Sequence, residues 1–204
     1  IQDLDLHWIA GAENYPGSWK MHVEKFSAEK VRKFDSYDPF KAEEVKPPGD
    51  GVNVKILLND TQIWPESGWA YTADSNHTIS FDVTADISQG DRLLFITNMN
   101  RNFGFDTTLF DPTIRYEDGE RHVASKEFTD EQGRNSWQYQ YIEKGNFVDL
   151  VYYPGPKQWR KEKDNPTGTP FVSANSQHPH PNQDAVRVWT ATKTGKARIT
   201  GKAC

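Results

Sequence analysis

The sequence predicts an all-β protein, an antiparallel β-sandwich with a jelly-roll-like arrangement. Three observations lead to this prediction. Short segments alternate apolar and polar residues with a period of two, turn-forming residues separate these segments, and the pattern recurs at short intervals along the chain. Sandwiches and jelly rolls are built from many short strands with this spacing.

The expected strands can be followed in chain order. In the segment 52–58, the apolar residues at 52, 54, 56 and 58 share one face, and Asn53 and Lys55 lie between them. The highly charged segment 27–46 predicts a solvated loop, with a short helix over 28–33 as the alternative. The strands that we expect cover residues 18–23, 52–58, 79–83, 93–97, 114–116, 137–141, 147–153, 186–190 and 197–200.

The segments near the two ends of the chain show a similar order of predicted elements, which suggests how the chain is divided into modules. Residues 3–23 and 184–200 both run in the order strand, alanine, glycine-containing turn and strand. We therefore predict a β-sandwich module over residues 1–117 and a β-rich extension over residues 118–204. The extension completes the same sandwich, begins a second repeat, or pairs with another chain by strand exchange, since unpaired strand edges invite such pairing.

Composition narrows the functional classes. The chain has 204 residues, a net charge of -5 and a pI near 5.7, which argues against nucleic acid as a partner. It contains no apolar stretch of about 18 residues, so no membrane span is expected. An aromatic share of 13% with a mean hydropathy of -0.82 is typical of sugar-binding proteins, whose rings cover the apolar faces of sugars. An ordinary β-protein that uses its aromatics in the core fits the same numbers.

Seven stretches of the chain carry a family resemblance. They cover residues 49–56, 62–65, 90–95, 105–114, 128–141, 178–179 and 184–191. In this order they resemble tandem β-sandwich carbohydrate-binding accessory modules of secreted bacterial (Paenibacillus-like) polysaccharide-degrading enzymes. Phe110 departs from the pattern, because the family has tryptophan there.

The resemblance implies a secreted, extracellular module that is attached to a glycoside hydrolase or a polysaccharide lyase. Its partners would be a polysaccharide and the attached catalytic domain. The single cysteine, Cys204, allows no intrachain disulfide, which is compatible with a bacterial exoprotein. The missing signal peptide and the end of the chain at Cys204 lead us to expect a fragment of a larger enzyme.

A run of alternating aromatics provides the first candidate binding residues. Trp137, Tyr139 and Tyr141 share one face of a strand over about 14 Å, which matches two or three sugar rings. The alternative is that this face is buried. In that case Gln138 and Gln140 point outward and bind sugar hydroxyls themselves.

A proline- and glycine-containing segment, residues 154–161, provides the second candidate. We expect Trp159 on a loop that is open to ligand, with Lys157 and Arg160 close by. Basic side chains beside an aromatic ring would suit an acidic polysaccharide such as xanthan. His178 is also placed among the candidate ligand-binding residues.

Two aspartates are candidates for a structural calcium site. Asp106 and Asp111 bracket four residues, and calcium prefers oxygen ligands of this kind. Aspartates in such positions serve equally well as turn and cap residues. No other cofactor is expected.

The leading hypothesis is non-catalytic carbohydrate binding that brings an attached or partner enzyme to polysaccharide. An enzyme is the first alternative: a small jelly-roll polysaccharide lyase or hydrolase, in which Tyr139 or His178 would act as the base and Arg134 would neutralise a uronate. A glycosidase needs two carboxylates across a cleft, and the sequence singles out no such pair, so no catalytic residue is assigned. The second alternative is a structural or assembly module that works by strand exchange.

Overall fold

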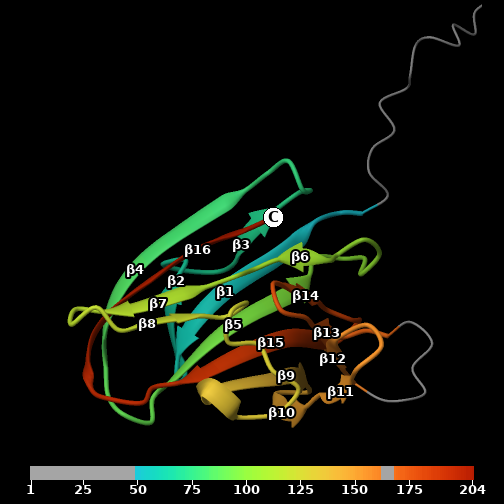
Figure 1. Cartoon of the computed structure of the whole chain (residues 1–204). Coiled ribbons are helices and arrows are strands. Elements are labelled where there is room, and N and C mark those ends of the chain that lie inside the picture. Colours follow the sequence, from blue (N-terminus) through green and yellow to red (C-terminus); the bar gives the residue numbers. More distant parts are fainter. Residues whose placement is uncertain (1–48, 162–167) are drawn as a thin grey trace, which may run out of the picture. The chain divides into compact units, whose positions relative to one another are not determined.

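Antiparallel sheets make up the part of the chain that the computed structural model describes, residues 49–161 and 168–204 (Figure 1). A seven-stranded sheet has the strand order β10-β9-β15-β5-β1-β2, and β3 pairs with β1 as well. Its strands are β1 (Val52–Leu58), β2 (Thr61–Trp64), β3 (Ala70–Thr72), β5 (Arg92–Met99), β9 (Trp137–Glu143), β10 (Asn146–Asp149) and β15 (Gln183–Thr190). The predicted fold class, an all-β antiparallel sandwich, is confirmed.

Two smaller sheets cover one face of the seven-stranded sheet. The four-stranded sheet has the order β4-β16-β7-β8 and the five-stranded sheet the order β11-β12-β13-β14-β6. Their strands are β4 (Ile79–Ile87), β16 (Gly195–Ala203), β7 (Thr113–Tyr116), β8 (Arg121–Val123), β11 (Val151–Tyr153), β12 (Gln158–Arg160), β13 (Phe171–Val172), β14 (Ser176–His178) and β6 (Thr108–Leu109). A short 3-10 turn, η2 (Arg134–Ser136), precedes β9.

The core lies between these layers. Alternate residues of the seven-stranded sheet point inward, because successive side chains of a strand face opposite ways. They pack against apolar residues of both smaller sheets, and this contact buries the largest side chains of the described chain. The core includes Val54, Ile56, Leu93, Phe95, Trp137, Tyr139 and Trp189 from the large sheet, and Phe81, Ile114, Ile199, Trp159 and Val172 from the smaller ones.

The predicted segment 147–153 forms two strands instead of one. β10 belongs to the seven-stranded sheet and β11 to the five-stranded sheet, and the buried residue Leu150 lies between them. The chain thus turns a corner from one layer of the sandwich to the other. The strand expected at 18–23, the segment 27–46 and the N-terminal copy of the repeat lie outside the described residues.

The C-terminal strands complete the sandwich that begins with β1. β15 lies between β9 and β5, and β16 lies between β4 and β7, so both strands are paired on their two sides. The boundary predicted between residues 117 and 118 falls in the turn that joins β7 to β8. The described residues on both sides of it form one compact unit with a shared core, which matches the alternative that the extension completes the same sandwich.

Candidate functional site

The aromatic face of β9 is part of the core. Trp137, Tyr139 and Tyr141 are all buried, and the indole Nε1 of Trp137 donates a hydrogen bond to Glu127 Oε2 at 2.7 Å. A ring that is enclosed between two sheets cannot stack on a polymer in solvent. The prediction that these three side chains bind sugar is therefore wrong, and they contribute to stability instead.

Trp159 is also a core residue. The segment expected to be a loop contains β12, and the Trp159 ring stacks on Tyr139 with 5.1 Å between ring centroids. Its Nε1 donates a hydrogen bond to the carbonyl oxygen of Thr129 at 2.9 Å. The expected exposed loop tryptophan is therefore wrong, because strand pairing turns this side chain inward.

The basic residues near Trp159 in sequence were predicted to bind sugar together with its ring, but that ring is buried. Arg160 donates two hydrogen bonds to Gln158 Oε1, at 2.8 and 3.0 Å, and Lys161 Nζ lies 3.5 Å from Glu143 Oε1. Lys157 is exposed in the turn before β12. Trp159 is buried and cannot be the aromatic ring of the acidic-sugar site predicted here, and Arg160 Cζ lies instead 5.9 Å from the centroid of the partly buried Tyr153 ring.

His178 and Arg134 are each held by a near neighbour. His178 is buried on β14, its Nδ1 lies 2.6 Å from the carbonyl oxygen of Pro179, and burial lowers the pKa of the imidazole. Arg134 pairs with Glu131 at 3.2 Å. The predicted role of His178 in ligand binding is not favoured, because its ring is enclosed. The proposed base Tyr139 is enclosed as well, and burial raises the pKa of its hydroxyl, so Tyr139 cannot act on a polymer.

The two glutamines of β9 point to the opposite, outer face of the seven-stranded sheet. Gln140 accepts a hydrogen bond from Arg92 Nη2 at 3.0 Å and donates one to Asp149 Oδ1 at 2.7 Å. Gln138 is partly exposed, and its side chain makes no hydrogen bond within the described part of the chain. The alternative considered for these residues, that they point away from a buried aromatic face, matches the structure.

Strand register shows which side chains share this outer face. Across the centre of the sheet, an apolar cluster of Leu94, Ile96, Val186 and Val188 is covered almost completely. Polar, aromatic and two further apolar side chains surround it. We call this surface the outer face; its other members include Asn53, Lys55, Leu57, Trp69, Tyr71, Arg92, Asn98, Gln138, Gln140, Ile142, Phe147, Asp149 and Asp184.

Exposed aromatic rings stand at both edges of the outer face. Trp69 and Tyr71 are 37% and 49% exposed beside β1, and Phe147 is 40% exposed on β10. Each edge pairs a ring with a cation: Lys55 Nζ lies 4.1 Å from the centroid of a Trp69 ring, and Arg92 Cζ lies 5.3 Å from that of Phe147. Five strand spacings separate β3 from β10, which corresponds to about 24 Å.

Hydrogen-bonding groups lie between the two aromatic edges. Asn98 Nδ2 donates to Asp184 Oδ1 at 2.5 Å. Burial raises the pKa of Asp184, while the Asn98 bond and the positive charge of Lys55 oppose this shift. Asn53 is partly exposed, and the described residues offer its side chain no hydrogen bond. The outer face therefore combines apolar rings at its ends with free amide groups between them.

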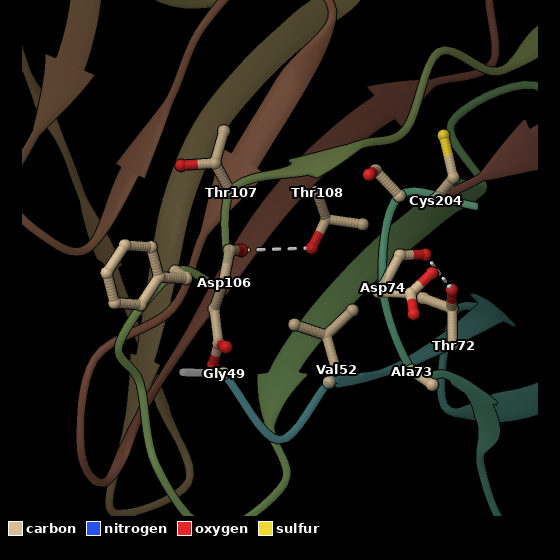
Figure 2. Close-up of a pocket in the computed structure, with 12 residues that line it drawn as sticks. Gly49, Val52, Thr72, Ala73, Asp74, Asp106, Thr107, Thr108 and Cys204 are labelled. Atoms are coloured by element: carbon tan, nitrogen blue, oxygen red, sulfur yellow. Dashed lines mark hydrogen bonds between the residues drawn. The ribbon is translucent and has the colours of Figure 1, made fainter. Parts of the chain in front are cut away.

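A small pocket of about 200 Å³ lies elsewhere, near the start of β1 (Figure 2). Its walls include Gly49, Thr72 and Asp106, and Figure 2 shows the Asp106 carboxylate beside Gly49. Asp106 is 2% exposed, and its Oδ2 has no hydrogen-bond partner among residues 49–161 and 168–204. Burial, together with the negative charge of Asp50, raises the pKa of Asp106 to about 7.

The two aspartates predicted to share a calcium ion face different parts of the structure. Asp111 accepts hydrogen bonds from the backbone nitrogen and the hydroxyl of Ser125, at 2.9 and 2.6 Å, while Asp106 faces the pocket. Among the described residues, no group of three or more His, Cys, Asp or Glu side chains is placed to hold a metal ion. The structure thus corrects the predicted site: Asp111 caps the Ser125 turn instead of joining Asp106.

Comparison with known proteins identifies no relative of this chain. No protein-family model matches the chain, and searches of curated proteins and of solved structures return no match either. No helix in the described part of the chain is long and apolar enough to cross a membrane. The described residues form a β-sandwich with exposed aromatic rings at both edges of one sheet surface, and the resemblance to accessory modules stays a prediction.

Sequence reasoning missed the aromatic members of the outer face. Trp69 and Tyr71 are two residues apart, which is the spacing that places both on one face of a strand. Phe147 is the second residue of β10, which begins directly after the turn at Lys144 and Gly145. Period-two spacing would have paired Trp69 with Tyr71, but only the sheet order shows that they share a surface with Phe147.

Proposed function

We propose that this protein binds polysaccharide on the outer face of its seven-stranded sheet, without catalysing a reaction. One observation carries the proposal: exposed aromatic rings lie at both edges of the face, with hydrogen-bonding side chains between them. An aromatic ring covers the apolar C–H face of a sugar, and amide groups pair with its hydroxyls. These two contacts together meet the needs of a carbohydrate.

The dimensions of the face favour a polymer over a small molecule. A pocket for a small ligand encloses most of that ligand, whereas the exposed rings of this face lie at opposite edges of the sheet. A chain that lies across the strands, from Trp69 to Phe147, would contact several residues along about 24 Å. The side-chain amides of Asn53 and Gln138 lie on this path, make no hydrogen bond among the described residues, and would donate to and accept from sugar hydroxyls.

Binding without catalysis is useful when an enzyme is attached. A module that holds a polymer raises the concentration of that polymer around a linked catalytic domain. We extend the proposal to this role, in a secreted bacterial polysaccharide-degrading enzyme. It is supported by the sequence resemblance described above and by the binding face.

Affinity electrophoresis in gels that contain neutral or acidic polysaccharides tests the proposal. We expect retardation by at least one polymer, and we expect Trp69→Ala and Phe147→Ala each to weaken it about tenfold, by loss of ring contact. Phe105→Ala is the matched control, because Phe105 is 77% exposed but lies at the Asp106 pocket. Normal retardation of both outer-face variants would rule out this surface.

The same mixtures separate binding from catalysis. New reducing ends would indicate a hydrolase, and ultraviolet absorption by an unsaturated product would indicate a lyase. We expect neither signal. Either one would replace the binding proposal with the enzyme alternative.

A further inference from the structure

We propose that the polysaccharide bound on the outer face carries carboxylate groups, and that Arg92 binds one of them beside Phe147. This inference rests on the proposed function, because it assigns a substrate class to that same face. It is carried by the contacts of two cations, Arg92 and Lys55.

Arg92 has hydrogen-bonding capacity that the protein does not use. Its Nη2 donates to Gln140 Oε1, which is a neutral acceptor, and no carboxylate of the described chain forms an ion pair with it. Because β15 lies between β5 and β9, the bond to Gln140 carries the guanidinium across the middle of the outer face. There it is partly buried and faces the ring of Phe147.

Lys55 is in the same situation at the other end of the face. Its ammonium group lies over Trp69 and has no ion-pair partner within the described residues. Two other cations of the described chain do form ion pairs: Arg198 on β16 forms a forked pair with Asp82, and Lys193 in the turn before β16 pairs with Asp118. On the outer face, neither of the two ring-bound cations forms an ion pair with a described residue.

Partial burial of a cation costs free energy, because the charged group loses part of its hydration. Contact with an aromatic ring restores some of this lost stabilisation, and a bound anionic ligand would restore more. A carboxylate accepts two parallel hydrogen bonds from a guanidinium, which is the strongest arrangement available to arginine. The free nitrogens Nε and Nη1 of Arg92 provide donors for such a bond.

The acidic residues of the face determine where the anion would bind. Asp184 lies near Lys55 and is hydrogen-bonded by Asn98, so its negative charge disfavours a ligand carboxylate at that end. Asp149 accepts the amide of Gln140 and forms no ion pair with Arg92. The position beside Arg92 and Phe147 is therefore the more favourable one for a ligand carboxylate.

The test compares a uronate-containing polymer such as xanthan with the same polymer after its carboxyl groups have been reduced to alcohols. We expect the native protein to bind the reduced polymer about tenfold more weakly. Arg92→Gln should weaken binding of the acidic polymer by a similar factor and weaken binding of the reduced polymer much less. Arg115→Gln is the matched control, because Arg115 is an exposed arginine of β7 on the four-stranded sheet.

Each result decides between the two proposals. Equal binding of both polymer forms, with Trp69→Ala still disruptive, would overturn the acidic-sugar inference and leave carbohydrate binding intact. If no polymer in the panel is retarded, both proposals fail together. Arg92→Lys separates loss of the ligand contact from a folding defect, because lysine keeps the positive charge but lacks the two parallel donors of the guanidinium. We expect Arg92→Lys to have an affinity for the acidic polymer between those of native protein and Arg92→Gln, and full affinity would contradict the assigned contact.

Discussion

Gln177 on β14 donates its side-chain amide to the hydroxyl of Thr97 on β5, at 3.0 Å, across the interior of the sandwich. Both residues are buried, and they belong to different sheets. The same amide nitrogen lies within hydrogen-bond distance of the carbonyl oxygens of Phe95 and Ala185. One polar side chain thus holds the five-stranded sheet against the two central strands of the seven-stranded sheet.

Replacing this glutamine tests the connection between the sheets. Gln177→Ala should lower the free energy of unfolding by about 2–3 kcal/mol, since buried groups lose a partner and a cavity forms. Urea unfolding followed by tryptophan fluorescence measures the change. Asn175→Ala, at an exposed neighbouring position, should change it by less than about 0.5 kcal/mol. A small effect of Gln177→Ala would show that the sheets are held together without this bond.

The buried carboxyl of Asp106 should make stability depend on pH. Its pKa is about 7 in the folded protein against an ordinary value of 3.8, so the folded state retains a proton that the unfolded state loses. The contribution of Asp106 to stability should therefore fall as the pH rises from about 4 to about 7. Asp106→Asn removes this dependence and should be more stable than the native protein at pH 8, by up to about 4 kcal/mol, with little difference at pH 4. Melting temperatures at both pH values check it.

The same pair of proteins tests whether Asp106 binds calcium. If its carboxylate is a ligand, calcium should raise the Tm of the native protein at pH 8 and leave that of Asp106→Asn unchanged. Equal shifts in both proteins would place any bound calcium elsewhere. Buried His178, whose pKa is lowered, acts in the opposite direction in both proteins, so the comparison is between native protein and Asp106→Asn: the same difference in stability at pH 4 and at pH 8 would contradict the raised pKa of Asp106.

Trp159 should matter for stability, in contrast to the exposed Trp69. Trp159→Ala removes a ring that stacks on Tyr139 in the core and should cost about 3–5 kcal/mol. Trp69→Ala should cost less than about 1 kcal/mol, because its ring is partly in solvent. Denaturant unfolding of both variants gives the comparison. Equal losses would contradict the assignment of one tryptophan to the core and the other to the ligand face.

Light scattering tests the strand-exchange alternative. β15 and β16 are each paired on both sides within one chain, so we expect a monomer with the chain mass of 23.4 kDa. A dimer that dissociates on dilution would favour assembly through the exposed edge strand β10.

The alternation of β9 could be predicted, but its direction could not. Period-two spacing placed Trp137 and Tyr139 on one face and Gln138 on the other, and this is what the structure has. Which face is buried depends on the sheet that packs against it, and that sheet is formed by residues distant in sequence. The aromatic run was therefore correctly grouped and wrongly assigned to the ligand.

Trp159 and Arg187 illustrate a second difficulty. The Pro-Gly-Pro sequence before Trp159 indicates a turn, and a three-residue strand is too short for its alternation to be recognised. Arg187 lies fully buried between Ala185 and Trp189 and donates to the carbonyl oxygen of Ser173 at 2.6 Å. No local pattern indicates that an arginine within a strand will point into the core, because its acceptors come from another sheet.

Neighbouring positions on β9 serve opposite sides of the sheet, and this separation has a use in protein engineering. If the outer face binds polysaccharide as proposed, a library that varies partly exposed outward residues, such as Gln138, would alter ligand preference without touching the packed aromatic positions beside it. Stability and specificity would then change almost independently during selection. Under the same proposal, the sandwich would be a scaffold on which new polymer specificities can be evolved from a single surface.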